Sequence, residues 1–125
     1  MTKFLLDTDV IINHLKGRSR IGFSLEELHK RWSLHLSTLT LVELYAGFAP
    51  AERKLVSSLF VQMSGIDISK SIGVSAGILI YDHKRKGINL TPADAIIAAT
   101  ALEKNLILVS HDNIYRKIAG VELHS

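Results

Sequence analysis

The sequence contains no cysteine, only two prolines, and no apolar run long enough to cross a bilayer. The absence of cysteine excludes disulfide bonds, thiolate metal ligands and cysteine nucleophiles. With 125 residues, of which 47% are apolar and 22% charged, the composition is that of one folded domain and not of a disordered chain. Any chemistry at a functional site must therefore rest on oxygen and nitrogen groups.

The N-terminal segment also lacks the features of an export signal. Its short apolar run is closed by Asp7, which leaves it too short for the core of a signal peptide. We therefore expect a cytoplasmic protein that does not enter the membrane. The 15 basic and 12 acidic residues give a net charge of +3, a mild excess that becomes informative only if the acids are concentrated in one place.

Strand patterns and helix patterns alternate along the chain. We expect strands at residues 4–7, 34–37, 66–68 and 106–110 and a last one from residue 121. We expect helices at residues 10–15 (capped by Asp9), 24–31, 39–48, 50–63, 69–86 and 91–105, and a short helix before the final strand. Strands separated by helices form βαβ units, so the pattern predicts an α/β domain over residues 1–125 whose parallel sheet has helices on both faces.

Four acids stand close to the carboxyl ends of predicted strands or in the helices that follow: Asp7, Glu43, Asp94 and Asp112. The carboxyl ends of parallel strands meet at one edge of a sheet, so three or four of these carboxylates are expected to share a pocket. Like charges at close range suppress one another's ionisation, and such a pocket therefore implies a divalent cation. Oxygen ligands favour Mg²⁺ or Mn²⁺ over zinc.

Each acid taken alone also has a structural explanation. The alternatives are two capping boxes, Thr40 with Glu43 and Thr91 with Asp94, and two helix N-caps, Asp9 and Asp112. Asp7 fits such an explanation less well, because it closes an apolar strand, where a carboxylate has a desolvation cost unless something pairs with it.

The charge balance supports the joint interpretation. Removing the four acids from the net charge of +3 leaves +7 on the rest of the chain, which suits a cation held inside and a phosphate backbone held outside. The candidate phosphate contacts are Lys16, Arg18, Arg20, Lys84, Arg85 and Lys86. The last three end a predicted helix, where cations complement the helix dipole and need no ligand to explain them.

Four motifs appear in order: FLLDTDVII at residues 4–12, STLTLVELYAG at 37–47, DAIIAATA at 94–101 and LVSHD at 108–112. Together they resemble the PIN-domain ribonucleases of the VapC toxin type, over nearly the whole chain. The resemblance implies a Rossmann-like three-layer α/β/α sandwich with a short parallel central sheet. It also implies an Mg²⁺ or Mn²⁺ site, endonucleolytic cleavage of RNA, and neutralisation by a cognate antitoxin.

By position, Asp7, Glu43 and Asp94 resemble the three best-defined acids of that family, and Asp112 resembles the more variable fourth. The resemblance makes these four the predicted catalytic and metal-binding residues. The residues predicted to support the site without holding the metal are Ser110, Thr8 and Asp9.

Two other functions remain open from the sequence. An apolar strand followed by Asp7, Thr8 and Asp9 also resembles the opening motif of haloacid dehalogenase-like phosphatases, with Asp7 as nucleophile, although the residues at 110–113 fit that family poorly. The second open function is that of a non-catalytic module that binds RNA or protein and whose acids serve as helix caps. His111 beside Asp112 is interpreted as a loop residue and not as a catalyst.

The apolar content of two helical segments predicts an interface. Residues 55–63 and 72–81 carry more apolar side chains than one face of a small sheet can cover. We expect a homodimer, and an antitoxin whose basic or amphipathic C-terminal segment covers a groove leading to the acids.

Overall fold

The computed structural model describes residues 2–17, 33–61 and 63–124. The predicted helix at residues 24–31 lies outside the described residues, as do the candidate phosphate contacts Arg18 and Arg20. Among the helices that are described, none is both long enough and apolar enough to cross a membrane.

The described strands form one parallel five-stranded sheet in the order β3-β2-β1-β4-β5. The strands are β1 (Lys3–Leu6), β2 (Ser33–Ser37), β3 (Ser64–Ile66), β4 (Ile107–Val109) and β5 (Leu123–His124). The central strand β1 pairs with β2 on one side and with β4 on the other. All carboxyl ends therefore lie at one edge, as the sequence predicts.

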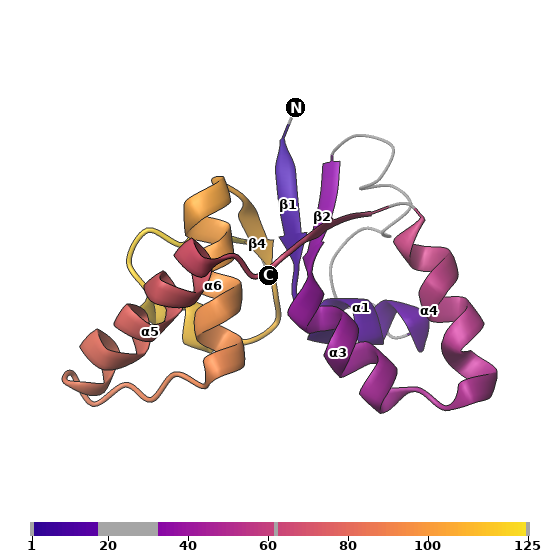
Figure 1. Cartoon of the computed structure of the whole chain (residues 1–125), viewed down its shortest axis with the longest axis horizontal. Helices are drawn as coiled ribbons and strands as arrows, with labels where there is room; N and C mark the ends of the chain where they lie inside the picture. The colour runs from indigo at the N-terminus through magenta and orange to yellow at the C-terminus, as the bar shows by residue number, and fades with distance from the viewer. Residues whose placement is uncertain (1, 18–32, 62, 125) are drawn as a thin grey trace.

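Helices cover both faces of the sheet (Figure 1). They are α1 (Thr8–Leu15), α3 (Thr38–Gly47), α4 (Arg53–Phe60), α5 (Lys70–Lys84) and α6 (Pro92–Lys104), with two 3₁₀ helices, η1 (Pro50–Glu52) and η2 (Asn113–Lys117). Alternate residues of β1 face opposite layers: Leu6 packs with Ile11 and Leu44, and Leu5 packs with Ile97. The predicted three-layer α/β/α fold is confirmed.

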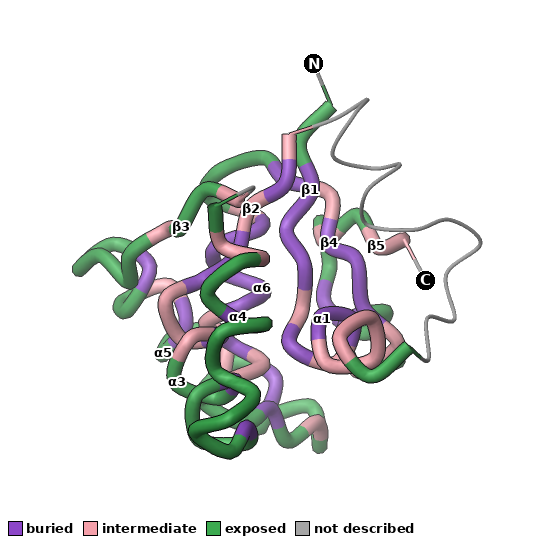
Figure 2. Tube along the Cα trace, turned by 90° about the vertical axis from the view of Figure 1, so that its right-hand side faces the viewer, coloured by how far each residue is buried: buried purple, intermediate pink, exposed green. Residues whose placement is uncertain are grey.

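The strands at the centre are buried along most of their length (Figure 2). On the α5–α6 side the contact between the helices is made by small residues, with Ala95 and Ala99 of α6 against Ile72 and Ala76 of α5. Because side chains of this size let two helix backbones approach closely, α6 is held firmly between α5 and the sheet.

Three predicted elements differ most clearly from their expected bounds or type. The third strand is Ser64–Ile66 instead of residues 66–68, because Ser64 lies opposite His35 in the pairing with β2. The predicted helix at 50–63 is a 3₁₀ turn followed by α4, which ends at Phe60. The last short helix is η2, a 3₁₀ helix.

Two predicted caps are wrong. Helix α1 is capped by Asp7 and not by Asp9, because β1 ends at Leu6 and leaves Asp7 in the extended conformation of a cap. Helix α3 is capped by Ser37, so Thr40 lies inside the helix and does not form a capping box with Glu43.

Candidate active site

A cavity of about 290 Å³ opens beyond the carboxyl ends of β1 and β4. It is lined by Asp7, Thr8, Asp9, Ile12, Glu43, Ala93, Asp94, Ile97, Asp112 and Tyr115. The structure therefore brings all four predicted acids to one cavity and adds Asp9 as a fifth carboxylate.

Asp7 is held by three donors. Its Oδ1 accepts a hydrogen bond of 2.9 Å from the backbone N–H of Thr8, its Oδ2 accepts one of 2.7 Å from Ser110 Oγ, and the Tyr115 hydroxyl also bonds to it. Burial and the charge of Asp9 raise the pKa of Asp7 to about 6, although the three donors act in the opposite direction. Asp7 is thus a carboxylate fixed by neutral donors, and within residues 2–17, 33–61 and 63–124 no cationic side chain lowers its pKa.

Glu43 reaches the cavity from α3 and is oriented by a hydroxyl. Thr8 Oγ1 donates to Glu43 Oε1 at 2.7 Å, and Thr40 Oγ1 lies 3.1 Å from Thr8 Oγ1. A hydroxyl has one proton to donate, so Thr40 donates to Thr8 while Thr8 donates to the carboxylate. The relay places Thr8, one of the predicted supporting residues, against Glu43 and adds Thr40 behind it.

Asp94 and Asp112 enter from the other side of β1. Thr91 caps α6, with its Oγ1 accepting from the backbone N–H of Asp94 at 3.1 Å, and this places Asp94 in the first helical turn. Asp112 Oδ1 caps η2 by accepting from Ile114 N at 3.0 Å, while its own N–H donates to Ser110 Oγ at 3.0 Å. The cap interpretation of Asp112 is therefore confirmed, and the same residue also lines the cavity.

Asp9 lies in the first turn of α1 and contacts the segment after β4. The backbone N–H of His111 donates to Asp9 Oδ2 at 3.1 Å, so His111 holds Asp9 through its backbone. Asp9 Oδ1 is buried and has no hydrogen-bond partner among the described residues. Burial is the main cause that raises the pKa of Asp9 above its ordinary value.

The donor set of this cavity fits a divalent cation that prefers oxygen. The five acidic side chains that line it are all carboxylates, and one of their buried oxygens has no donor among the residues that the structure describes, a state that is costly unless a positive charge pairs with it. Across the part of the chain that the structure describes, no three Asp, Glu or His side chains are drawn together as a ligand group. Because carboxylates at close range repel one another, we expect a cation to be needed to bring these side chains to ligand distances.

Tyr115 is a site residue that the sequence reasoning missed. It is 1% exposed, lines the cavity and bonds to Asp7 through its hydroxyl. Burial and the nearby charges of Asp7 and Asp94 raise the pKa of Tyr115 well above its usual range, so it acts only as a neutral donor. The one available signal was an aromatic residue three positions after Asp112.

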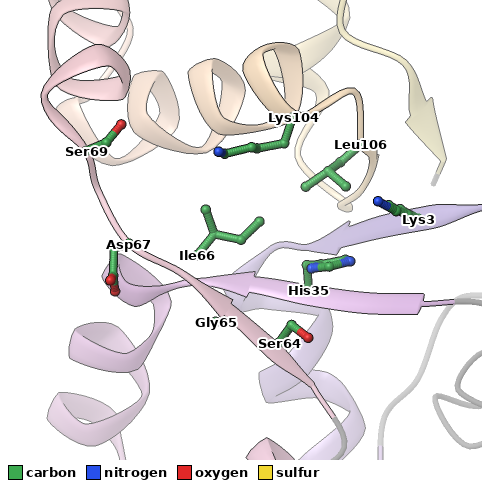
Figure 3. Close-up of a pocket in the computed structure, with 9 residues that line it drawn as sticks. All are labelled: Lys3, His35, Ser64, Gly65, Ile66, Asp67, Ser69, Lys104 and Leu106. Carbon is green, nitrogen blue, oxygen red and sulfur yellow. The ribbon is translucent and has the colours of Figure 1, made fainter.

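A second cavity, of about 510 Å³, has a different chemistry. It is lined by Lys3, His35, Ser64, Gly65, Ile66, Asp67, Ser69, Lys104 and Leu106 (Figure 3). Burial and the charge of Lys3 lower the pKa of His35, and Asp67 is the sole carboxylate among these lining residues. Although larger than the acid-lined cavity, it lacks the cluster of acids that a divalent cation requires.

These observations define a class of protein: a three-layer α/β/α fold with an acid-lined cavity beyond the carboxyl ends of its parallel strands. The model of the PIN domain family matches residues 4–121. Ribonuclease VapC10 of Mycobacterium tuberculosis is 30% identical over 106 residues, covering 85% of this chain and 80% of that protein. The chain belongs to the PIN-domain family and, within it, to the VapC-type proteins, as the four motifs predict.

Other similar proteins align with this chain over nearly its full length. The tRNA(fMet)-specific endonuclease VapC of Salmonella typhimurium is 26% identical over 134 aligned positions, covering 98% of this chain and 97% of that protein. The crystal structure of VapBC2 from Rickettsia felis bound to a promoter DNA fragment superposes with a TM-score of 0.86 at 21% identity, covering 98% of both chains. DNA-bound VapBC from Salmonella typhimurium gives 0.84 at 24%, covering 99% and 98%. The structural agreement bears on the fold alone, and none of these matches favours the dehalogenase-like alternative.

Proposed function

We propose that this chain is a divalent-metal-dependent endoribonuclease and the toxin of a toxin–antitoxin pair. Its 125 residues would form one nuclease domain that acts in the cytoplasm. The residues that would hold one or two Mg²⁺ or Mn²⁺ ions are Asp7, Glu43, Asp94 and Asp112. The observation that carries the proposal is the convergence of these four acids, from four separate segments, on one cavity in a chain of the VapC type.

A bound divalent cation supplies two effects: it lowers the pKa of water and offsets the negative charge that develops on the phosphoryl oxygens. The protein supplies the positions. Ser110, Tyr115 and the backbone of Thr8 hold Asp7, and Thr8 Oγ1 turns Glu43 toward the cavity. The first turn of α6 places Asp94 where the helix dipole stabilises a negative charge.

The test is cleavage of single-stranded RNA by the purified protein. With Mg²⁺ or Mn²⁺ we expect products with 5′-phosphate and 3′-hydroxyl ends, and with EDTA no cleavage. Asp94→Asn is expected to lower the rate by about 100-fold or more, because it removes a cation-binding charge. Asp82→Asn, a matched change at an exposed position of α5, is expected to keep the wild-type rate.

Two results would contradict the proposal. If Asp82→Asn lost as much activity as Asp94→Asn, the acid cavity would not be the site. If the protein left RNA intact and hydrolysed small phosphate monoesters through an aspartyl-phosphate, the dehalogenase-like function would replace it.

We also propose an antitoxin partner and a homodimer. Large apolar side chains remain exposed on α3, α4 and α5, among them Val42, Leu55, Val74, Ile78 and Tyr81, which are 55% exposed or more. Exposed apolar surface of this kind is typical of interfaces. Sedimentation of the isolated chain as a monomer, together with failure of the protein encoded beside it to bind, would count against both partners.

A further inference from the structure

Asp9 is an acid whose second carboxylate oxygen is explained neither by a helix cap nor by the supporting role expected for it. The cap of α1 is Asp7, and Asp9 lies in the first turn of that helix. Its Oδ2 accepts the backbone N–H of His111 at 3.1 Å, whereas its Oδ1 is buried and lacks a partner among the described residues. Asp9 nevertheless lines the cavity that holds the four predicted acids.

The contact with His111 does not require an aspartate. One acceptor oxygen satisfies one N–H, and an asparagine would provide it without a charge. Asp9 brings a second oxygen and a negative charge next to Asp7 and Asp112, both of which interact with it unfavourably. The His111 ring and the backbone N–H of Val10 interact with the carboxylate favourably, but burial outweighs them. A buried carboxylate oxygen without a donor is costly unless a cation binds it. The second oxygen thus has the chemistry of a metal ligand and no protein partner in the described chain.

We propose that Asp9 is a fifth carboxylate ligand of the divalent cation in this cavity, binding through Oδ1 while Oδ2 keeps its contact with the backbone of His111. The inference rests on the proposed function, because it assumes that a cation binds among the acids. The two oxygens of an aspartate turn together about one broad torsion, so Oδ1 turns toward the cation only within the small range that keeps the 3.1 Å contact of Oδ2 with His111.

Ligation by Asp9 would also join two segments that build the site. Asp9 belongs to the start of α1, and its partner His111 stands between Ser110, which holds Asp7, and Asp112. A cation bound to Asp9 would therefore draw the turn after β1 and the turn after β4 together. Binding of the metal is expected to stabilise both turns at once.

Asp9→Asn separates ligation from the contact with His111, since asparagine keeps an acceptor oxygen and loses the charge. We expect this variant to fold, and its metal-free melting temperature to equal or exceed that of the wild type, because one repelling charge is gone. We expect Mn²⁺ to bind at least about tenfold more weakly. Asp82→Asn removes the same charge from an exposed position of α5 and is expected to bind Mn²⁺ as the wild type does.

The experiment is calorimetric titration of Mn²⁺ into the full chain, wild type and both variants, with the bound Mn²⁺ located by anomalous diffraction from wild-type crystals. We expect a loss of Mn²⁺ affinity in Asp9→Asn alone, and Mn²⁺ at about 2.1 Å from an Asp9 oxygen in the wild-type crystals. Equal affinities for Asp9→Asn and wild type, or Mn²⁺ in the cavity with Asp9 bound only to protein, would overturn the role of Asp9 and leave the proposed function standing. A wild type that takes up no Mn²⁺ in the cavity would overturn both.

Discussion

At the scale of the residue, three donors converge on Asp7, yet its pKa is still raised to about 6. The donors come from the start of α1, from the end of β4 and from η2, so the position of this carboxylate depends on three segments. Burial and the charge of Asp9 outweigh them. The ionised Asp7 therefore lowers the stability of the metal-free protein at neutral pH, and a cation would remove that penalty.

The pH dependence of stability tests this environment. The folded-state pKa of Asp7 is about 6 against an ordinary value of 3.8, so its penalty is fully present above about pH 6 and fades as the pH falls toward 3.8. In EDTA, lowering the pH from 7.5 to 4.5 should stabilise the wild type relative to Asp7→Asn by about 2 kcal/mol, because at roughly 1.4 kcal/mol per pKa unit the whole penalty is about 3 kcal/mol and part of it is still present at pH 4.5. Urea denaturation at both pH values measures the difference.

Asp82→Asn is the control for this experiment, because Asp82 is exposed and its variant should keep a constant difference from the wild type across the same pH range. The prediction fails if the difference in free energy of unfolding between wild type and Asp7→Asn stays constant, or if the variant becomes relatively more stable, as the pH falls. Either result would show that the ionised Asp7 does not lower the stability of the folded protein.

Some of these residue-scale features could be predicted from the sequence, and others could not. The four acids could be assigned to one edge of the sheet, because the local sequence pattern shows where each acid stands relative to the end of a strand. The cap of α1 was assigned to Asp9, since Asp7 and Asp9 are both good caps and the choice depends on where β1 stops. The Tyr115 hydroxyl and the unpartnered oxygen of Asp9 depend on contacts between distant segments, which local patterns do not encode.

At the scale of the element, α6 is the helix that positions the site most directly. Thr91 and Pro92 start it, and Asn105, in the left-handed conformation with φ of 54°, ends it. These signals are local, and the sequence therefore predicted the helix well. Strand β3 was misplaced by two residues, because three residues that include Gly65 carry no strand pattern and only pairing with β2 defines them.

The contact between α5 and α6 predicts a size limit at Ala99. This residue is 1% exposed and packs among Ile72, Ala76 and Ala95, so a larger side chain must push the helices apart. Ala99→Leu should lower the free energy of unfolding by about 1–3 kcal/mol, measured by urea denaturation. Ala46→Leu, at an exposed position of α3, is the matched control and should change it little. Equal effects of the two substitutions would mean that the α5–α6 contact is not tightly packed.

At the scale of the whole molecule, negative charge gathers in the cavity while the rest of the chain is basic. Two of the predicted phosphate contacts already stack on aromatic rings: Lys16 Nζ lies 5.9 Å from the ring centroid of Phe48, and the Arg85 guanidinium 5.8 Å from that of Tyr81. We therefore expect RNA to be attracted by the basic surface as a whole and not by one cluster.

Salt dependence measures that attraction. Binding of labelled single-stranded RNA to the Asp94→Asn variant, followed by fluorescence anisotropy, should weaken by about tenfold or more between roughly 50 and 200 mM salt, as expected for about three neutralised phosphates. The variant keeps the basic surface and is expected not to consume the RNA. Binding that does not change with salt would exclude an electrostatic role for this surface.

The central claim is that the acids of the cavity form a cation site and are not merely helix caps, and the melting temperature of Asp94→Asn with and without Mn²⁺ tests it most directly. Asparagine keeps the size of the side chain, and Thr91 remains the cap of α6. We predict that the metal-free variant melts at or above the wild-type temperature, since one repelling charge is removed. Mn²⁺ at about 100 times its Kd should stabilise the wild type by about 2.7 kcal/mol and the variant by much less. A variant that loses about 0.3–1 kcal/mol without metal, as expected when an acid is removed from the first turn of a helix, and an Mn²⁺ effect absent from both proteins would contradict the claim.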